Sequence, residues 1–178
     1  MRLLAILLLM TLGLSLCPSR LAHAGSYWGL RGGFAADGKD ENALQFEGFG
    51  AYHLPWDLRN RGGWGVSTQM ELTAGILRSK GEYGFVGSLG PSFGIGNPRY
   101  PVQVDIGISV AILSRDKFGS RDYNGIEQFI SHAGLIYRIN RHLGLSYRFQ
   151  HMSNAGFNGS PNPGLNMHLL GANWYFSQ

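Results

Sequence analysis

The sequence has few of the features that stabilise small exported proteins or mark helical membrane proteins. Its 178 residues include a single cysteine, Cys17, which excludes an internal disulfide. Beyond residue 24 there is no apolar run of the about 20 residues that a transmembrane helix needs. Charged residues make up only 15% of the chain, and a formal net charge of +4 is too small to indicate a nucleic-acid-binding protein.

The N-terminus has the layout of a secretory signal peptide. Arg2 precedes an apolar run from Leu3 to Leu16, and the small residues of Ala22-His23-Ala24 form a cleavage site. We therefore expect residues 1–24 to be a cleaved signal peptide and residues 25–178 to form a single domain. Loss of Arg2 and Arg20 would lower the formal net charge from +4 to +2 and remove all cysteine.

Two other interpretations of the N-terminus fit less well. An uncleaved membrane anchor would need a longer apolar run than Leu3 to Leu16 provides. A lipoprotein site at Cys17 would follow Leu16, which is bulky for a residue at such a cleavage position.

The chain is rich in glycine and in aromatic residues, a combination that favours closed β-structure. It has 27 glycines, and 12% of its residues are aromatic. Apolar side chains alternate with polar ones or glycine from Trp64 to Ile76 and again from Pro101 to Leu113, as expected for strands with one apolar face. Both segments are longer than the about five or six residues of a typical soluble strand, and tilted membrane strands have this length.

The same alternation predicts eight strands. They cover residues 27–34, 44–54, 64–76, 82–93, 101–113, 128–139, 143–153 and 166–176. We expect an all-β fold, an eight-stranded antiparallel transmembrane β-barrel of the outer membrane, with short turns at one rim and longer loops at the other. The alternative is a soluble, lipocalin-like barrel with its apolar face turned inward.

Charged residues in mid-strand favour the membrane barrel. The polar faces carry Glu47, Glu71, Asp105, Arg138 and Arg148, which can pair with one another inside a narrow barrel while the apolar faces meet lipid. Near the C-terminus, Trp174 and Phe176 continue the pattern, although the chain ends in Ser-Gln where many outer-membrane barrels end in an aromatic residue.

One strand carries a base and a nucleophile. His151 and Ser153 are two residues apart, so both lie on one face of the strand over residues 143–153. Leu145, Tyr147 and Phe149 share that face. The pattern predicts esterase-type chemistry on an apolar surface.

The segment His151-Met-Ser-Asn-Ala-Gly156, followed by Pro161-Asn-Pro-Gly164, resembles the PagL family of lipid A 3-O-deacylases. The resemblance implies an outer-membrane serine esterase that releases a 3-hydroxy fatty acid from lipopolysaccharide, without a cofactor or metal. It makes Ser153 the nucleophile and His151 the base, with Asn154 in support. It also implies that Gly156 and Asn162 bind the oxyanion.

The third member of the triad departs from the family pattern. The family has a glutamate at the start of the last strand, where this chain has Asn166. Asn166 has the outward parity of Leu170 and Trp174, and an asparagine can fix a histidine tautomer without adding charge. The alternative is a carboxylate from elsewhere, for which Glu127, expected roughly opposite Asn154, is the candidate.

The predicted partners are lipid A and the outer membrane, with no nucleic acid, and a homodimer is left open. The competing hypothesis is a non-catalytic barrel with a structural or adhesive role, in which the missing glutamate marks lost activity.

Overall fold

The computed structural model describes residues 25–36, 42–159 and 162–176; the predicted signal peptide lies outside these ranges. Within these ranges there are eleven strands: β1 (Tyr27–Ala35), β2 (Leu44–His53), β3 (Leu58–Arg59), β4 (Gly65–Ser79), β5 (Glu82–Gly96), β6 (Val102–Leu113), β7 (Lys117–Phe118), β8 (Arg121–Asp122), β9 (Glu127–Arg138), β10 (Leu143–Ser153) and β11 (Leu165–Tyr175). No helix in the described part of the chain is long and apolar enough to cross a membrane.

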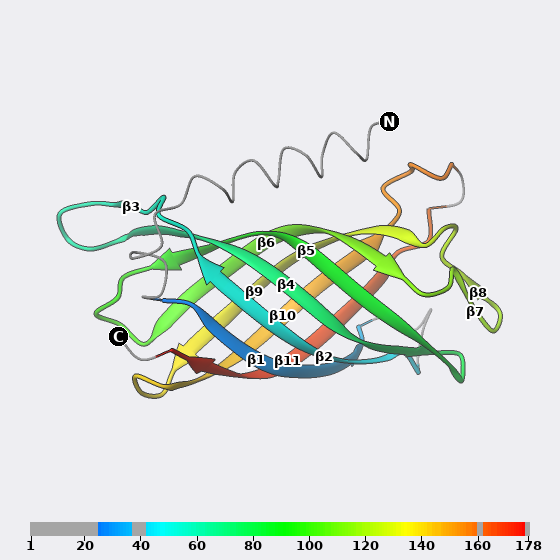
Figure 1. Cartoon of the computed structure of the whole chain (residues 1–178), viewed down its shortest axis with the longest axis horizontal. Coiled ribbons are helices and arrows are strands. Elements are labelled where there is room, and N and C mark those ends of the chain that lie inside the picture. The colour runs from blue at the N-terminus through cyan, green and yellow to red at the C-terminus, as the bar shows by residue number, and fades with distance from the viewer. Residues whose placement is uncertain (1–24, 37–41, 160–161, 177–178) are drawn as a thin grey trace.

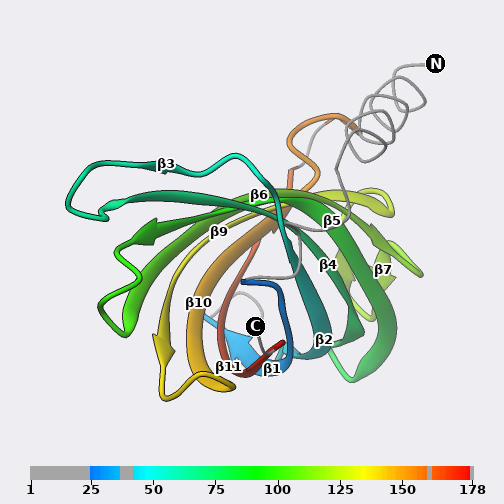
Figure 2. The same ribbon diagram turned by 60° about the vertical axis from the view of Figure 1, so that its left-hand side comes forward.

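Eight long antiparallel strands close into a barrel. The order β2-β1-β11-β10-β9-β6-β5-β4 returns on itself because β2 also pairs with β4. Figure 2 shows the resulting ring, with the short strand β3 on a hairpin outside it. The predicted eight-stranded barrel is therefore confirmed, and the two-residue strands β3, β7 and β8 are additions within its connections.

The predicted strands agree with the observed ones to within three residues at each end. Differences of three residues occur at the end of β5 and at the end of β4, where the sequence pattern predicted a loop over residues 77–81. Strand β4 instead continues to Ser79, which leaves a two-residue turn at Lys80 and Gly81, whose φ angles of 48° and 85° are typical of a type I′ hairpin. Glycine at the second position adopts the positive φ angle of this turn with little conformational strain.

The two ends of the barrel differ. Strand β1 begins and β11 ends at the left of Figure 1, and we call this end the proximal rim. The opposite end, the distal rim, carries β7, β8 and the connection between β10 and β11. Connections at the proximal rim span residues 54–64, 97–101 and 139–142, whereas the distal connections include the loops at residues 114–126 and 154–164.

The outer wall is apolar and the interior is polar in its middle. Exposed side chains on the wall include Leu72, Ile76, Ile108 and Leu170, as expected for a lipid-facing surface. In the interior, Arg148 bonds Glu71 at 2.7 Å, and Arg31 bonds Glu71 at 2.8 Å. The interior is therefore filled by ion pairs that cross from strand to strand, as the sequence pattern indicated, except that Arg138 is exposed at the proximal rim and has no carboxylate partner among the described residues.

This network extends to the other inward-facing polar groups. Arg148 also reaches Asp105 at 3.2 Å, and His132 Nε2 lies 3.1 Å from the same carboxylate. Arg31 pairs with Glu47 as well. His132 is thus an interior histidine with a carboxylate partner.

An apolar plug fills the interior at the distal rim. It comprises Ala43, Leu77, Val86, Ala111, Leu113, Phe118, Tyr123, Ile130, Met152, Leu165 and Met167. Met152 and Leu165 face each other across β10 and β11. Because both are buried in the plug, the outward-facing neighbours of these two residues stand on a rigid part of the barrel wall.

Candidate active site

His151 and Asn166 form a hydrogen-bonded pair on the outer wall near the distal rim. They are directly opposite in the antiparallel register of β10 and β11, and both are partly buried. His151 Nδ1 donates to Asn166 Oδ1 over 2.7 Å. An amide oxygen accepts only, so this bond fixes the Nδ1–H tautomer and leaves Nε2 of the neutral ring as a proton acceptor.

Two serines flank the imidazole on the same face. Ser153 follows His151 by two residues on β10 and is 8% exposed, and its hydroxyl makes no hydrogen bond within the described residues. Catalytic hydrogen bonds are often long before substrate binds. Ser131 of β9 lies directly opposite His151 and is exposed. Sequence reasoning missed Ser131, because its nearness to His151 appears only once the register of β9 is known.

The chain turns sharply after Ser153. Ala155 and Gly156 have φ angles of 51° and 78°, and the N–H of Phe157 donates to the carbonyl of Asn154 at 2.9 Å. A left-handed alanine is unusual, and such strain is often found at functional sites. The turn directs the N–H of Phe157 back to Asn154, the residue that follows Ser153.

The candidate oxyanion donors lie in this turn and in the following segment. The N–H of Gly156 donates to Asn154 Oδ1 at 2.8 Å, so this amide already has a partner. Asn162 is exposed. The structure therefore brings Asn154 and Gly156 together beside Ser153, and it gives no contact that joins Asn162 to them.

Gly164 lies directly against the imidazole. A Cβ atom added at this glycine would lie 2.5 Å from His151 Cε1 and 3.4 Å from each ring nitrogen. Arg121 of β8 donates from Nη2 to the Gly164 carbonyl at 2.6 Å. Arg121 thus holds the segment that supports the histidine, a contact between residues far apart in the sequence that no local pattern signals.

The loop containing β7 and β8 also holds the turn after Ser153. The carbonyl of Asn124 accepts hydrogen bonds from the side chains of Asn154 at 3.1 Å and Asn158 at 2.9 Å. The N–H of Asn124 donates to Asp122, and this bond together with Lys117 lowers the pKa of the Asp122 carboxyl below its ordinary value. Residues 117–124 therefore brace both sides of the candidate site.

Glu127, the alternative acid, is exposed at the start of β9. The register pairs Ser153 with Phe129, which places Glu127 about one residue further from Asn154 than the sequence suggested. None of its contacts in the described part of the chain joins it to His151. Asn166 is the residue that occupies the position beside Nδ1.

The wall on the barrel-centre side of the pair is aromatic. Phe149 lies opposite His168, and their ring centroids are 5.4 Å apart. Tyr147 bonds His168 Nδ1 through its hydroxyl at 2.8 Å, and Phe34 of β1 packs on the same histidine. The Tyr147 hydroxyl and His168 Nδ1 therefore satisfy each other, and the aromatic rings around them form a surface that suits a hydrocarbon chain.

Comparison with known proteins identifies the family of the chain. The family model described as lipid A 3-O-deacylase (PagL) matches residues 46–175. The chain belongs to the PagL family. Its fold and its family make it an outer-membrane β-barrel and a lipid A deacylase of the hydrolase class. The resemblance seen in residues 151–166 is thereby confirmed at the level of the family.

Solved structures agree on the fold. The crystal structure of the outer membrane enzyme PagL matches with a TM-score of 0.73 and 15% identity, covering 85% of this chain and all of that one. The N-terminal β-barrel domain of Pseudomonas aeruginosa OprF has a TM-score of 0.59 and 16% identity over 85% of this chain and 96% of that chain. Neisserial surface protein A has a TM-score of 0.56 and 14% identity over 86% and 98%. Comparison with curated protein sequences finds no match.

Proposed function

We propose that this PagL-family protein is a serine esterase that cleaves the ester at the 3 position of lipid A, with Ser153 as nucleophile and His151 as base. The hydrogen bond between His151 and Asn166 on the outer wall is the observation that carries the proposal. The ester position comes from the description of the family.

The position of the pair suits a substrate that stays in the membrane. Outer-membrane barrels with an even number of strands have both termini in the periplasm, so the distal rim lies at the height of the outer leaflet, where lipopolysaccharide resides. His151 and Asn166 face outward there, above the cluster of Tyr147, Phe149 and His168. A lipid A acyl chain can lie along this cluster while its ester reaches the imidazole.

The reaction proceeds in two halves. His151 Nε2 takes the proton of Ser153 as Oγ attacks the ester carbonyl, and the tetrahedral intermediate collapses when the imidazolium protonates the departing sugar oxygen. Water, deprotonated by His151, then hydrolyses the acyl-serine and releases a 3-hydroxy fatty acid. Each half returns the imidazole to its starting protonation state.

The negative oxygen of each intermediate needs donors. In this proposal Gly156 turns its N–H from Asn154 to the substrate, and the Asn162 side chain adds a second hydrogen bond. The left-handed backbone at residues 155 and 156 presents this amide at the exposed surface of the turn. Asn154 holds the turn until substrate arrives.

Mass spectrometry of lipid A incubated with refolded protein tests the proposal. We expect loss of one 3-hydroxyacyl chain, with fragment ions that assign it to the 3 position, and we expect Ser153→Ala and His151→Ala to abolish the loss. Ser131→Ala is the matched control, because it removes another serine hydroxyl beside the same histidine. It should retain activity.

Two other results of this assay would contradict the proposal. If Ser131→Ala abolishes the reaction and Ser153→Ala does not, the nucleophile is on β9. Unchanged lipid A with a folded wild-type barrel would support the structural or adhesive alternative.

A further inference from the structure

The described part of the proximal rim has many more basic than acidic side chains. Its connections and the adjoining end of β9 hold five arginines, Arg59, Arg61, Arg99, Arg138 and Arg141; against them stands a single acidic residue, Asp57. Among the described residues, this rim has neither lysine nor glutamate. The five arginines are shared among all three connections, so they surround the barrel mouth.

The distal rim is different. Its basic residues alternate with acidic ones in the described loops, and they form ion pairs such as Arg115 with Glu82 and Lys117 with Asp122. Among the described residues of the proximal rim, the one carboxylate, Asp57, lies 3.4 Å from Arg59 and 3.5 Å from His53. The excess of positive charge is therefore a property of one end of the barrel.

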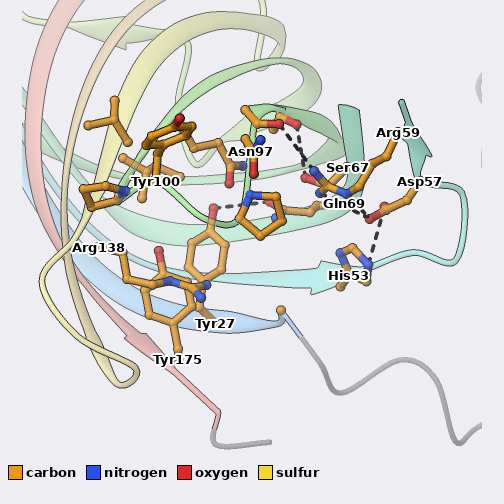
Figure 3. Close-up of a pocket in the computed structure, with 18 residues that line it drawn as sticks. Tyr27, His53, Asp57, Arg59, Ser67, Gln69, Asn97, Tyr100, Arg138 and Tyr175 are labelled. Carbon is orange, nitrogen blue, oxygen red and sulfur yellow. Dashed lines mark hydrogen bonds and ion pairs between the residues drawn. The ribbon is translucent and has the colours of Figure 1, made fainter. Parts of the chain in front are cut away.

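Most of the proximal arginines have guanidinium groups available to a ligand. Within the described residues, the side chains of Arg61, Arg99 and Arg141 are exposed and make no hydrogen bond or ion pair. Arg138 packs over the ring of Tyr175 at 4.0 Å and likewise has no carboxylate partner. Arg59 and Arg138 line a polar cavity of about 260 Å³ at the mouth, shown in Figure 3.

Apolar and aromatic side chains stand beside these arginines. Trp56, Leu58 and Trp64 are 58%, 75% and 54% exposed on the hairpin that carries β3, which projects from the barrel at this rim (Figure 1). Tyr100, next to Arg99, packs on Trp64 with ring centroids 5.7 Å apart. Tryptophan, tyrosine and arginine together are typical of residues at a membrane surface.

We propose that this arginine ring, the residues Arg59, Arg61, Arg99, Arg138 and Arg141, binds the phosphate groups of anionic phospholipids in the periplasmic leaflet. Guanidinium groups bind phosphate oxygens in pairs, and a basic surface prefers lipids that carry net negative charge. The exposed Leu58 and Trp56 favour a lipid surface over a hydrated acidic polymer such as peptidoglycan, because they gain from burial in the interface.

The test compares two triple variants that remove equal charge. Arg61→Gln/Arg99→Gln/Arg141→Gln takes one exposed arginine from each proximal connection. The matched control, Lys80→Gln/Arg115→Gln/Lys117→Gln, takes three cations from the distal rim. Native mass spectrometry of each protein in detergent with equimolar phosphatidylglycerol and phosphatidylcholine, of identical acyl chains, gives the ratio of bound lipids.

We expect phosphatidylglycerol to be enriched on the wild type and on the distal control. The proximal variant should lose at least about fivefold of this enrichment, the effect of roughly one arginine at an anionic surface. Enrichment on the wild type should also fall as salt is raised. Lipid A deacylation by the proximal variant should be unchanged, because the ring is at the other end of the barrel.

Three results would overturn the proposal. The proximal variant could keep the wild-type lipid ratio, or the distal control could lose as much enrichment as the proximal variant. The third result would be that the wild type co-sediments with purified peptidoglycan and the proximal variant does not, while both proteins bind the two lipids in the same ratio. A shift in gel mobility on heating verifies that each variant is folded before it is scored.

Discussion

Substitution of Gly164 by alanine tests the position of the proposed base without removing any catalytic group. The added Cβ would lie 2.5 Å from His151 Cε1, whereas carbon atoms in contact are normally about 3.5–4.0 Å apart. The segment around Gly164 is held by Arg121 at its carbonyl. We therefore expect the imidazole to move by about 1 Å, away from Asn166 or from the serine.

The size of the effect follows from this displacement. A misplacement of about 1 Å can lower an enzymatic rate about 100-fold, which corresponds to about 2.7 kcal/mol of transition-state stabilisation. The fold should be nearly unaffected, because Gly164 is not in the left-handed region and its neighbour is a side chain. The stability should change by less than about 1 kcal/mol.

The assay is the rate of 3-hydroxy fatty acid release from lipid A, measured alongside urea unfolding. Gly50→Ala is the matched control, since a Cβ at that outward position of β2 meets no atom within 4 Å. In a His151→Ala background, Gly164→Ala should have no further effect on the rate. A folded Gly164→Ala barrel with wild-type activity would show that His151 is not the base in this geometry.

Substitutions at three other positions separate the catalytic, structural and bracing roles. Asn166→Glu should increase the deacylation rate, because a carboxylate keeps the hydrogen bond to His151 and adds charge, whereas Asn166→Leu should decrease it by more than tenfold; a lower rate for the glutamate variant would contradict this. Glu71→Gln should destabilise the barrel by about 3–5 kcal/mol in urea unfolding, because the buried Arg31 and Arg148 lose the carboxylate that they share and keep only one carboxylate partner each; unchanged stability would show that this shared carboxylate does not stabilise the barrel. Arg121→Met should reduce kcat more than KM, with partial recovery in Arg121→Lys, whereas a change confined to stability would assign the arginine a purely structural role.

The strands were predictable because a barrel imposes a strict period of two. Leu72 and Ile76 face lipid while Glu71 faces the interior, so the polarity of each of these residues indicates which side of the barrel wall it faces. The turn at Lys80 and Gly81 was missed because its residues continue no alternation and carry only one glycine. A short I′ turn leaves a weaker trace in the sequence than the strands that it joins.

Of two contacts at the candidate site, one could be predicted from the sequence and the other could not. His151 and Asn166 share an outward parity, which was enough to predict that they lie on the same surface. The contact of Arg121 with Gly164 joins a loop hairpin to a segment beyond the next two strands, and it depends on how these two distal connections pack. Neither composition nor spacing encodes such a contact.

The choice between Asn166 and Glu127 depends on register. Both residues have outward parity, and a pairing shifted by a single residue decides which of them lies within reach of an imidazole. The register of β10 and β11 pairs His151 with Asn166, close enough for a hydrogen bond. On the other side of β10, His151 is paired with Ser131 of β9, and Glu127 lies four residues further along that strand. A carboxylate from Glu127 would have to cross that distance, about 13 Å of strand, so the orienting role falls to the neutral amide.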